Sequence, residues 1–183
     1  MLYRKAYDRL LQWKQNKNKT ALCIQGARQI GKTTAVREFG KNEYKCFVEF
    51  NFVSDLDARR IFDGNLDANT IIEGITALSR KQLIPGDTLI LFDEIQECPN
   101  ARTALKFLAI DNKYDVIASG SLLGISYKSV PSIPVGYERQ LTMYSLDFEE
   151  FLWAIGFNEN SISYIKEHFE NHEKIENGIN DEM

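Results

Sequence analysis

The chain has 183 residues, a length that fits one domain with a sizeable core. Apolar residues make up 44% and charged residues 26%, which is ordinary for a soluble globular protein, and no apolar run is long enough to predict a membrane span. The net charge of −4, without a strongly basic block, argues against nucleic-acid binding by this domain alone.

The N-terminus and the cysteines indicate the cellular compartment, and the C-terminal residues are more acidic than the rest of the chain. The N-terminus has no apolar stretch of signal-peptide length, and Cys23, Cys46 and Cys98 are widely spaced, so we expect a cytoplasmic protein with reduced thiols. Residues 159–183 carry seven acids and two lysines, a net of −5, which leaves the remainder at +1. We therefore expect a single domain over residues 1–158, followed by an acidic tail that is helical or disordered.

Short apolar runs alternate with segments of helical periodicity along most of the chain. The helical spacing predicts helices at about residues 3–15, 33–39, 55–63, 68–81, 101–110 and 148–155. The apolar runs predict strands at residues 20–24, 46–52, 88–92, 115–118 and 140–146. Gly40 is expected to close the second of these helices. Apolar strands that alternate with helices are typical of an α/β fold with a parallel sheet covered on both faces.

A glycine-rich loop follows the first predicted strand. Residues 26–33 read Gly-Ala-Arg-Gln-Ile-Gly-Lys-Thr and match the pattern G-x-x-x-x-G-K-[ST]. Gly26 and Gly31 allow tight turns that point backbone N–H groups at phosphate oxygens, beside the positive end of the next helix. We expect Lys32 to bridge the β- and γ-phosphates and the Thr33 hydroxyl to bind Mg²⁺. The residues predicted to contact ATP or ADP here are Gly26, Ala27, Arg28, Gln29, Ile30, Gly31, Lys32, Thr33 and Thr34.

A second motif ends the third predicted strand, Leu89-Ile-Leu-Phe-Asp93-Glu94. A carboxylate at the end of a buried strand can lie close to the phosphates, where Asp93 would hold the hydrated Mg²⁺. The adjacent Glu94 can polarise the water that attacks the γ-phosphate, which makes it the candidate general base. Paired acids at this point favour ATPases with a catalytic glutamate over small GTPases and nucleotide kinases.

A third pattern has a better structural explanation than a functional one. Asn112-Lys113-Tyr114-Asp115 fits the N-K-x-D pattern that reads guanine in GTPases. Here it lies only 19 residues after Asp93, precedes a strand instead of following one, and has no Asp-x-x-Gly before it. We therefore interpret these residues as a turn between a helix and a strand.

The motifs together resemble a large prokaryotic family of AAA-type ATP-binding proteins, related to the archaeal-type ATPases and to the signal-transduction NTPases with numerous domains. The resemblance covers about residues 1–158. The segments that carry it are Gly-Ala-Arg-Gln-Ile-Gly-Lys-Thr (26–33), Phe-Asp-Glu-Ile-Gln (92–96), Ser-Gly-Ser (119–121) and Tyr-Ser-Leu-Asp-Phe-Glu-Glu-Phe (144–151).

This resemblance implies a P-loop NTPase fold, a three-layer sandwich around a five-stranded, mostly parallel sheet. The sheet would be of the additional-strand type, with a sensor strand between the loop strand and the Asp-Glu strand. It also implies that Ser119 or Ser121 is a polar sensor near the γ-phosphate and that Arg139 is a candidate charge sensor with a catalytic role. The family usually has Gly-Arg shortly before its fifth strand, whereas this chain has Gly136-Tyr-Glu-Arg139.

The favoured interpretation is Mg²⁺-dependent ATP binding and hydrolysis that drives a switch. Two alternatives stay open: a regulatory module that binds ADP or ATP without hydrolysis, and an ATPase accessory to a nucleic-acid or mobile-element process. The expected partners are nucleotide, a protein partner or second copy of the chain, and the C-terminal domain that the family implies and this chain lacks. We expect hydrolysis by this shorter form to be slow.

Overall fold

The computed structural model of the protein describes residues 3–16, 20–121 and 136–172, except the side chain of Ser121. Its internal contacts divide the chain into two compact units. The larger unit is Ala6–Ser145, and the smaller one combines Met1–Lys5 with Leu146–Met183. The last eleven residues of the predicted acidic tail, 173–183, lie outside the described part.

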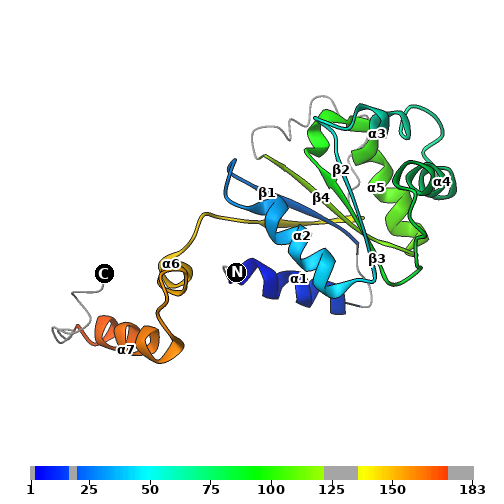
Figure 1. Ribbon diagram of the computed structural model, residues 1–183. Coiled ribbons are helices and arrows are strands. Elements are labelled where there is room, and N and C mark those ends of the chain that lie inside the picture. Colours follow the sequence, from blue (N-terminus) through cyan, green and yellow to red (C-terminus); the bar gives the residue numbers. More distant parts are fainter. Residues whose placement is uncertain (1–2, 17–19, 122–135, 173–183) are drawn as a thin grey trace. The chain divides into compact units, whose positions relative to one another are not determined.

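The larger unit contains a five-stranded sheet in the order β2-β3-β4-β1-β5 (Figure 1). The strands are β1 (Ala21–Gly26), β2 (Cys46–Asn51), β3 (Thr88–Asp93), β4 (Asp115–Ser121) and β5 (Glu138–Thr142). Each pair of neighbouring strands is parallel. The predicted α/β fold is therefore confirmed, and β4 lies between the loop strand β1 and the Asp-Glu strand β3, as the resemblance implied.

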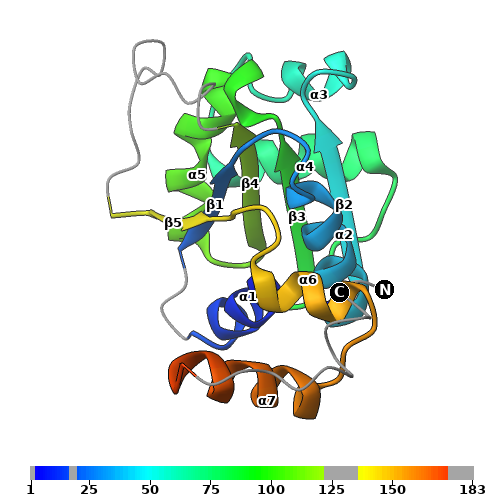
Figure 2. The same cartoon turned by 90° about the vertical axis from the view of Figure 1, so that its left-hand side faces the viewer.

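Helices cover both faces of this sheet (Figure 2). The helices of this unit are α1 (Lys5–Gln15), α2 (Lys32–Glu43), α3 (Leu56–Arg60), α4 (Ala68–Ser79) and α5 (Pro99–Asp111). Alternation along β3 shows how the two cores form. Leu89 and Leu91 pack with the buried side chains of α1 and α2, whereas Ile90 and Phe92 pack with those of α4 and α5. Because both faces are covered, the central strands are apolar along most of their length.

Helix α2 is longer than the sequence predicted, because Gly40 does not end it. The helix continues through Gly40 to Glu43. A Cβ atom at Gly40 would lie 2.4 Å from Cδ2 of Phe47, so glycine is needed here for close packing against β2. The expectation that Gly40 closes the helix was wrong, since the residue serves tertiary packing instead of a helix end.

Strand β5 also differs from its prediction. It covers Glu138–Thr142 instead of residues 140–146, and its last pair joins Thr142 to Gln25 of β1. Strand β1 ends one residue later at Gly26, where the glycine-rich loop begins. The N–H of Met143 still donates to the Gln25 carbonyl oxygen at 2.8 Å, and the chain leaves the sheet after this bond.

The smaller unit contains α6 (Phe148–Ala154) and α7 (Glu159–Glu170). Asp147 and Glu150 form a capping box at the start of α6, and Glu150 also accepts from Arg4 Nε at 3.2 Å and Lys5 N at 2.8 Å. Leu152, Ile162 and Ile165 form its small core. Within the described residues, no helix combines the length and the apolar character needed to cross a bilayer.

Candidate functional site

The glycine-rich loop joins β1 to α2, as the sequence predicted. A Cβ atom at Gly26 would lie 2.2 Å from the carbonyl oxygen of Met143, so only glycine fits between the loop and the chain after β5. Gly31 has φ 88° at the start of α2, a left-handed conformation that glycine adopts without strain. Gln29 has φ 63° in the same loop. Gly26 is therefore needed because a side chain would not fit, and Gly31 because its backbone is left-handed.

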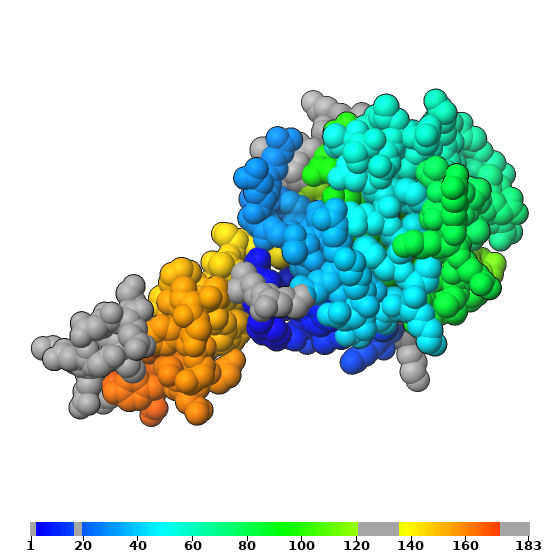
Figure 3. Space-filling view, viewed as in Figure 1, coloured from blue at the N-terminus to red at the C-terminus, as the bar shows by residue number. Residues whose placement is uncertain are grey.

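Lys32 is held inside the loop. It is 9% exposed, and its Nζ donates to the carbonyl oxygens of Ala27 at 2.6 Å and Gly26 at 3.2 Å. Ala27, Arg28 and Gln29 are exposed, and the loop forms part of the surface seen in Figure 3. The ammonium group therefore lies under an exposed loop, where phosphate oxygens could replace the two carbonyl partners.

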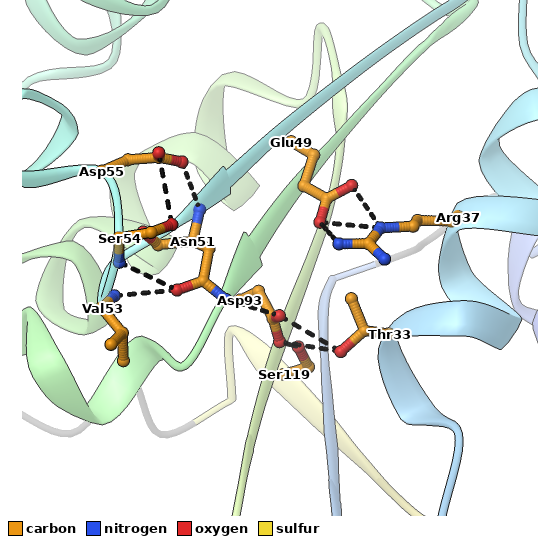
Figure 4. Close-up of polar contacts among 9 residues, drawn as sticks. All are labelled: Thr33, Arg37, Glu49, Asn51, Val53, Ser54, Asp55, Asp93 and Ser119. Atoms are coloured by element: carbon orange, nitrogen blue, oxygen red, sulfur yellow. Dashed lines mark hydrogen bonds and ion pairs between the residues drawn. The ribbon is translucent and has the colours of Figure 1, made fainter. Parts of the chain in front are cut away.

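Asp93 is the point where the polar side chains of the site converge (Figure 4). Its carboxylate is 5% exposed and accepts hydrogen bonds from three elements. Thr33 Oγ1, in α2, lies 3.1 and 3.2 Å from the two carboxylate oxygens. Ser119 Oγ, in β4, donates to Oδ1, and Asn51 Nδ2, at the end of β2, donates to Oδ2 at 3.0 Å. All three donors are neutral groups, so the Asp93 charge has no cationic partner among these contacts.

Strand pairing explains this convergence. Asp93 pairs with Asn51 in the parallel register, and its side chain follows Leu91 on the face that α2 covers. Ser119 follows Ile117 on the same face of β4. Because the carboxyl ends of parallel strands lie at one edge of the sheet, the three residues meet beside the first turn of α2.

Asn51 belongs to no motif, and the sequence predicts it only as an interior residue of a strand. Its Oδ1 accepts from the backbone N–H of Val53 at 2.9 Å and of Ser54 at 3.2 Å. Its own N–H donates to Asp55 Oδ2 at 2.8 Å. The turn after β2 therefore fixes the amide so that its NH₂ group faces Asp93. The available signal was a polar residue at the end of a strand neighbouring the Asp-Glu strand.

A second contact between α2 and β2 lies on the same face of the sheet. Arg37 donates through Nε and Nη2 to the carboxylate of Glu49, with distances of 2.6 to 2.9 Å. Such a fork fixes the relative orientation of the two side chains better than a single bond does. The pair is partly exposed, so it orients α2 more than it stabilises the fold.

Glu94 follows Asp93 and has an unusual backbone. Its φ of 53° lies in the left-handed region, a conformation that costs a non-glycine residue about 1–3 kcal/mol. It caps the short 3₁₀ helix η1 (Ile95–Glu97), and its carboxylate accepts a hydrogen bond from Gln96 Nε2. Gln96 was noted in the sequence only as part of the family motif.

The residues predicted to hold Mg²⁺ form a suitable donor set. The Thr33 hydroxyl and the Asp93 carboxylate lie together and offer only oxygen atoms, which are the ligands that Mg²⁺ prefers. Mg²⁺ usually takes few protein ligands and completes its shell with water and substrate phosphates. The geometry is therefore compatible with the predicted metal site.

Arg139 and Ser121 are the other two residues that the resemblance predicted for this site. Arg139 pairs with Leu22, four residues before Gly26, which corresponds to about 13 Å along a strand. Its side chain is exposed, and the structure does not bring it to the loop. Ser121 is the last residue of β4 and pairs with Gly26, but its side chain lies outside the described part.

The N-K-x-D pattern lies at the opposite edge of the sheet. Asn112 ends α5 in a left-handed conformation, with φ 50°. Asp115 begins β4, pairs with Leu89 and accepts a hydrogen bond from the Tyr44 hydroxyl at 2.6 Å. These residues form a turn between a helix and a strand, as their sequence context predicts.

Comparison with known proteins agrees with the geometry. A family model described as an AAA domain matches residues 18–152, a range that includes the loop, Asp93, Glu94 and β4. A search among curated proteins finds no match.

Proposed function

Because the chain belongs to the AAA domain family, as its motifs led us to expect, we propose that it binds Mg·ATP or Mg·ADP and hydrolyses ATP as a nucleotide-driven switch. The observation that carries this proposal is the convergence of Thr33, Ser119 and Asn51 on Asp93 beside the glycine-rich loop. The family and the parallel sheet support a nucleotide-binding ATPase domain of the P-loop type. The roles of individual residues belong to the proposal.

In the proposed bound state, the loop N–H groups and the N-terminus of α2 surround the phosphates. Lys32 exchanges its bonds to Gly26 and Ala27 for bonds to phosphate oxygens, so that its charge is used on the nucleotide. Thr33 and Asp93 hold Mg²⁺, which when bound neutralises charge on the β- and γ-phosphate oxygens. Freed from Thr33, the Asp93 carboxylate is still oriented by Asn51.

Glu94 is the proposed general base for hydrolysis. Its carboxylate would accept a proton from the water that attacks the γ-phosphate, and Ser119 would contact the γ-phosphate as a polar sensor. Asn51 donates to Asp93 and accepts from the turn after β2, so a shift of Asp93 on nucleotide binding would change the position of that turn. A change in this turn is a route by which nucleotide state could alter contacts with a partner domain or a second copy of the chain.

We propose that hydrolysis by the chain alone is slow. A positive group that reaches the γ-phosphate can add about 10³–10⁵ in rate, and the register of β5 keeps Arg139 about 13 Å along the strand from the loop. A partner would supply this charge. We therefore expect kcat below about 0.1 per second, against about 1 or more for an ordinary enzyme.

A module that binds nucleotide without turnover is the second candidate. One observation favours it: Arg139, the arginine predicted to act on the γ-phosphate, lies about 13 Å along the strand from the loop. The two candidates agree on binding and differ only on hydrolysis.

One experiment separates them. Titration calorimetry with Mg·ADP should detect binding to the wild type and to Glu94→Gln with similar affinity. Phosphate release from Mg·ATP should then be at least about 100-fold faster for the wild type, the usual scale for a positioned base. Equal, negligible release from both proteins would leave the binding module as the function. Absence of binding would exclude both candidates.

A further inference from the structure

Gln96 lies between two parts of the site whose roles differ. Its Nε2 donates to Oε2 of Glu94, and its Oε1 is buried without a hydrogen-bond partner among the described residues. This oxygen lies against Gly120, in β4, next to Ser119. The Gln96 side chain therefore connects Glu94, the proposed base, to strand β4, whose Ser119 donates a hydrogen bond to Asp93.

The orientation of the Gln96 amide follows from chemistry. An ionised carboxylate accepts hydrogen bonds and donates none, so the NH₂ group has to face Glu94. The carbonyl oxygen then points toward Gly120. Reversing the amide would place two acceptors together at Glu94.

Gly120 supplies the space for this arrangement. A Cβ atom there would lie 2.7 Å from Oε1 of Gln96, and the other atoms that it would approach lie 3.8 Å away. Gly120 lies within a regular strand and is not among the residues with positive φ, so its backbone conformation does not require glycine. The glycine therefore makes room for the Gln96 side chain in particular.

The bond between Gln96 and Glu94 is not needed to close the turn that contains them. Backbone bonds already define this turn, from Glu97 N to Glu94 O at 2.9 Å and from Cys98 N to Ile95 O at 3.1 Å. Ile95 is 2% exposed and anchors η1 in the core. The Gln96 side chain thus acts on the Glu94 carboxylate beyond what the local backbone fixes.

We propose that Gln96 is a positioning residue that aligns the Glu94 carboxylate for water activation. The amide N–H engages Oε2 and fixes the rotation of the carboxylate, so that Oε1 is the oxygen that accepts the proton of the attacking water. Gly120 sets the position of the amide. This inference rests on the proposed hydrolysis and names a residue on which the rate of that step depends.

Gln96→Met tests the proposal, because methionine has a similar length and volume and lacks the N–H donor. We expect kcat for ATP to fall about 10- to 100-fold, the scale for losing alignment of a reacting group. KM for ATP and the Kd of Mg·ADP should stay within about twofold, since the Gln96 amide donates to Glu94 and not to a nucleotide-binding group of the loop. Gln12→Met, on the exposed face of α1, is the matched control and should leave kcat unchanged.

Two double variants distinguish positioning from a structural role. In a Glu94→Gln background, Gln96→Met should cause no further loss, because there is no base left to align, whereas a structural defect would add to the loss. Gly120→Ala should lower kcat like Gln96→Met, and it should have no additional effect once Gln96→Ala has removed the carbonyl. Thermal melting of each variant identifies those that have lost their fold.

The possible results separate this proposal from the function on which it rests. If wild-type hydrolysis does not exceed that of Glu94→Gln, the proposed hydrolysis is wrong and the role of Gln96 falls with it. If the wild type is much faster than Glu94→Gln and Gln96→Met is as fast as the wild type, only the Gln96 proposal is overturned. Additive losses in the Glu94→Gln background would also overturn it.

Discussion

The parallel sheet has an amino edge, where its strands begin, and a carboxyl edge, where they end. Both edges bury polar side chains, but the hydrogen-bond partners of these side chains differ. At the amino edge, Arg102 donates to Glu138 at 2.9 Å, and Cys23 Sγ lies 3.4 Å from the same carboxylate. Tyr44 donates to Asp115 at 2.6 Å. Burial raises the pKa of the Cys23 thiol, and the charge of Glu138 raises it further, so the thiol stays protonated and can donate. Each of these two carboxylates therefore has a buried hydrogen-bond donor from another element.

At the carboxyl edge the partners are neutral and exchangeable. Asp93 has Thr33, Ser119 and Asn51 as its hydrogen-bond donors, and no cation is among these contacts. Lys32 donates to loop carbonyls instead of to a carboxylate. The Lys32 ammonium and the Asp93 carboxylate each make these hydrogen bonds to neutral groups, which an anion and a metal ion could replace.

The difference indicates which polar groups stabilise the protein and which serve binding. Removing one member of a buried ion pair leaves a buried charge without compensation, so the free energy of unfolding should fall. Removing a group with neutral, exchangeable partners should affect ligand affinity more than stability. Substitutions at the two edges can therefore test this difference.

The largest effect is expected from Arg102→Met at the amino edge. The Arg102 and Glu138 side chains are 3% and 7% exposed, so the variant leaves a buried carboxylate without its cation. We expect the free energy of unfolding to fall by about 3–5 kcal/mol, measured by urea denaturation. The Kd of Mg·ADP for the folded protein should not change.

The matched control is Arg60→Met, since the Arg60 side chain in its pair with Asp57 is 79% exposed. Its effect on unfolding should be less than about 0.5 kcal/mol. Equal losses for Arg102→Met and Arg60→Met would show that the amino edge is not held by its buried charges.

Lys32→Ala should have the next largest effect, on binding. The ammonium is expected to make two charge-assisted hydrogen bonds to phosphate, and their loss corresponds to about a 100-fold weaker Kd for Mg·ADP, or about 2.7 kcal/mol. Titration calorimetry measures the affinity, and thermal melting should show that the fold survives. Lys41→Ala, an exposed lysine of the same helix, should bind like the wild type. An unchanged affinity for Lys32→Ala would remove the loop from the proposed site.

The fold was largely predictable because its signals are local. Apolar runs identified the five strands to within a few residues, and the glycine pattern located the loop between β1 and α2. Gly40 misled because the local rule for helix ends cannot reveal that Phe47, from another element, packs against it. The early end of β5 could not be predicted from the sequence either, because it depends on where its partner strand β1 ends.

The site was predictable only in part, for the same reason. Thr33 and Asp93 come from separate motifs, and the structure brings them within 3.1 Å. Asn51 belongs to no motif, and its contact with Asp93 arises from the register of two strands that are distant in sequence. Arg139 was assigned by resemblance alone, and its register with Leu22 depends on pairing that the sequence does not encode locally.

Tyr44→Phe tests the amino edge with a smaller change. It removes one hydroxyl and leaves the buried Asp115 carboxylate without this donor. We expect a loss of about 2 kcal/mol in the free energy of unfolding, since a buried charged acceptor loses a partner. Nucleotide affinity should be unaffected, because Asp115 lies at the other edge from the loop. A weaker Kd for Mg·ADP in this variant would mean that the two edges are coupled.

Asp93→Asn is expected to have the smallest effect, and it tests the metal at the carboxyl edge. The amide keeps the size of the carboxylate and one acceptor oxygen, but it loses the charge that would hold Mg²⁺. For the wild type, replacing excess Mg²⁺ with EDTA should weaken ADP binding about tenfold, or about 1.4 kcal/mol. For Asp93→Asn the two conditions should give nearly the same Kd, measured by calorimetry.

The unfolding free energy should fall less for Asp93→Asn than for Arg102→Met, because the partners of Asp93 are neutral and the variant leaves no unpaired charge. If EDTA still weakens ADP binding tenfold in the variant, the metal is held elsewhere. A stability loss as large as that of Arg102→Met would mean that Asp93 is a structural residue like the amino-edge pairs. The neutral partners of Asp93 would then serve to hold the sheet together rather than to leave the carboxylate available for a metal ion.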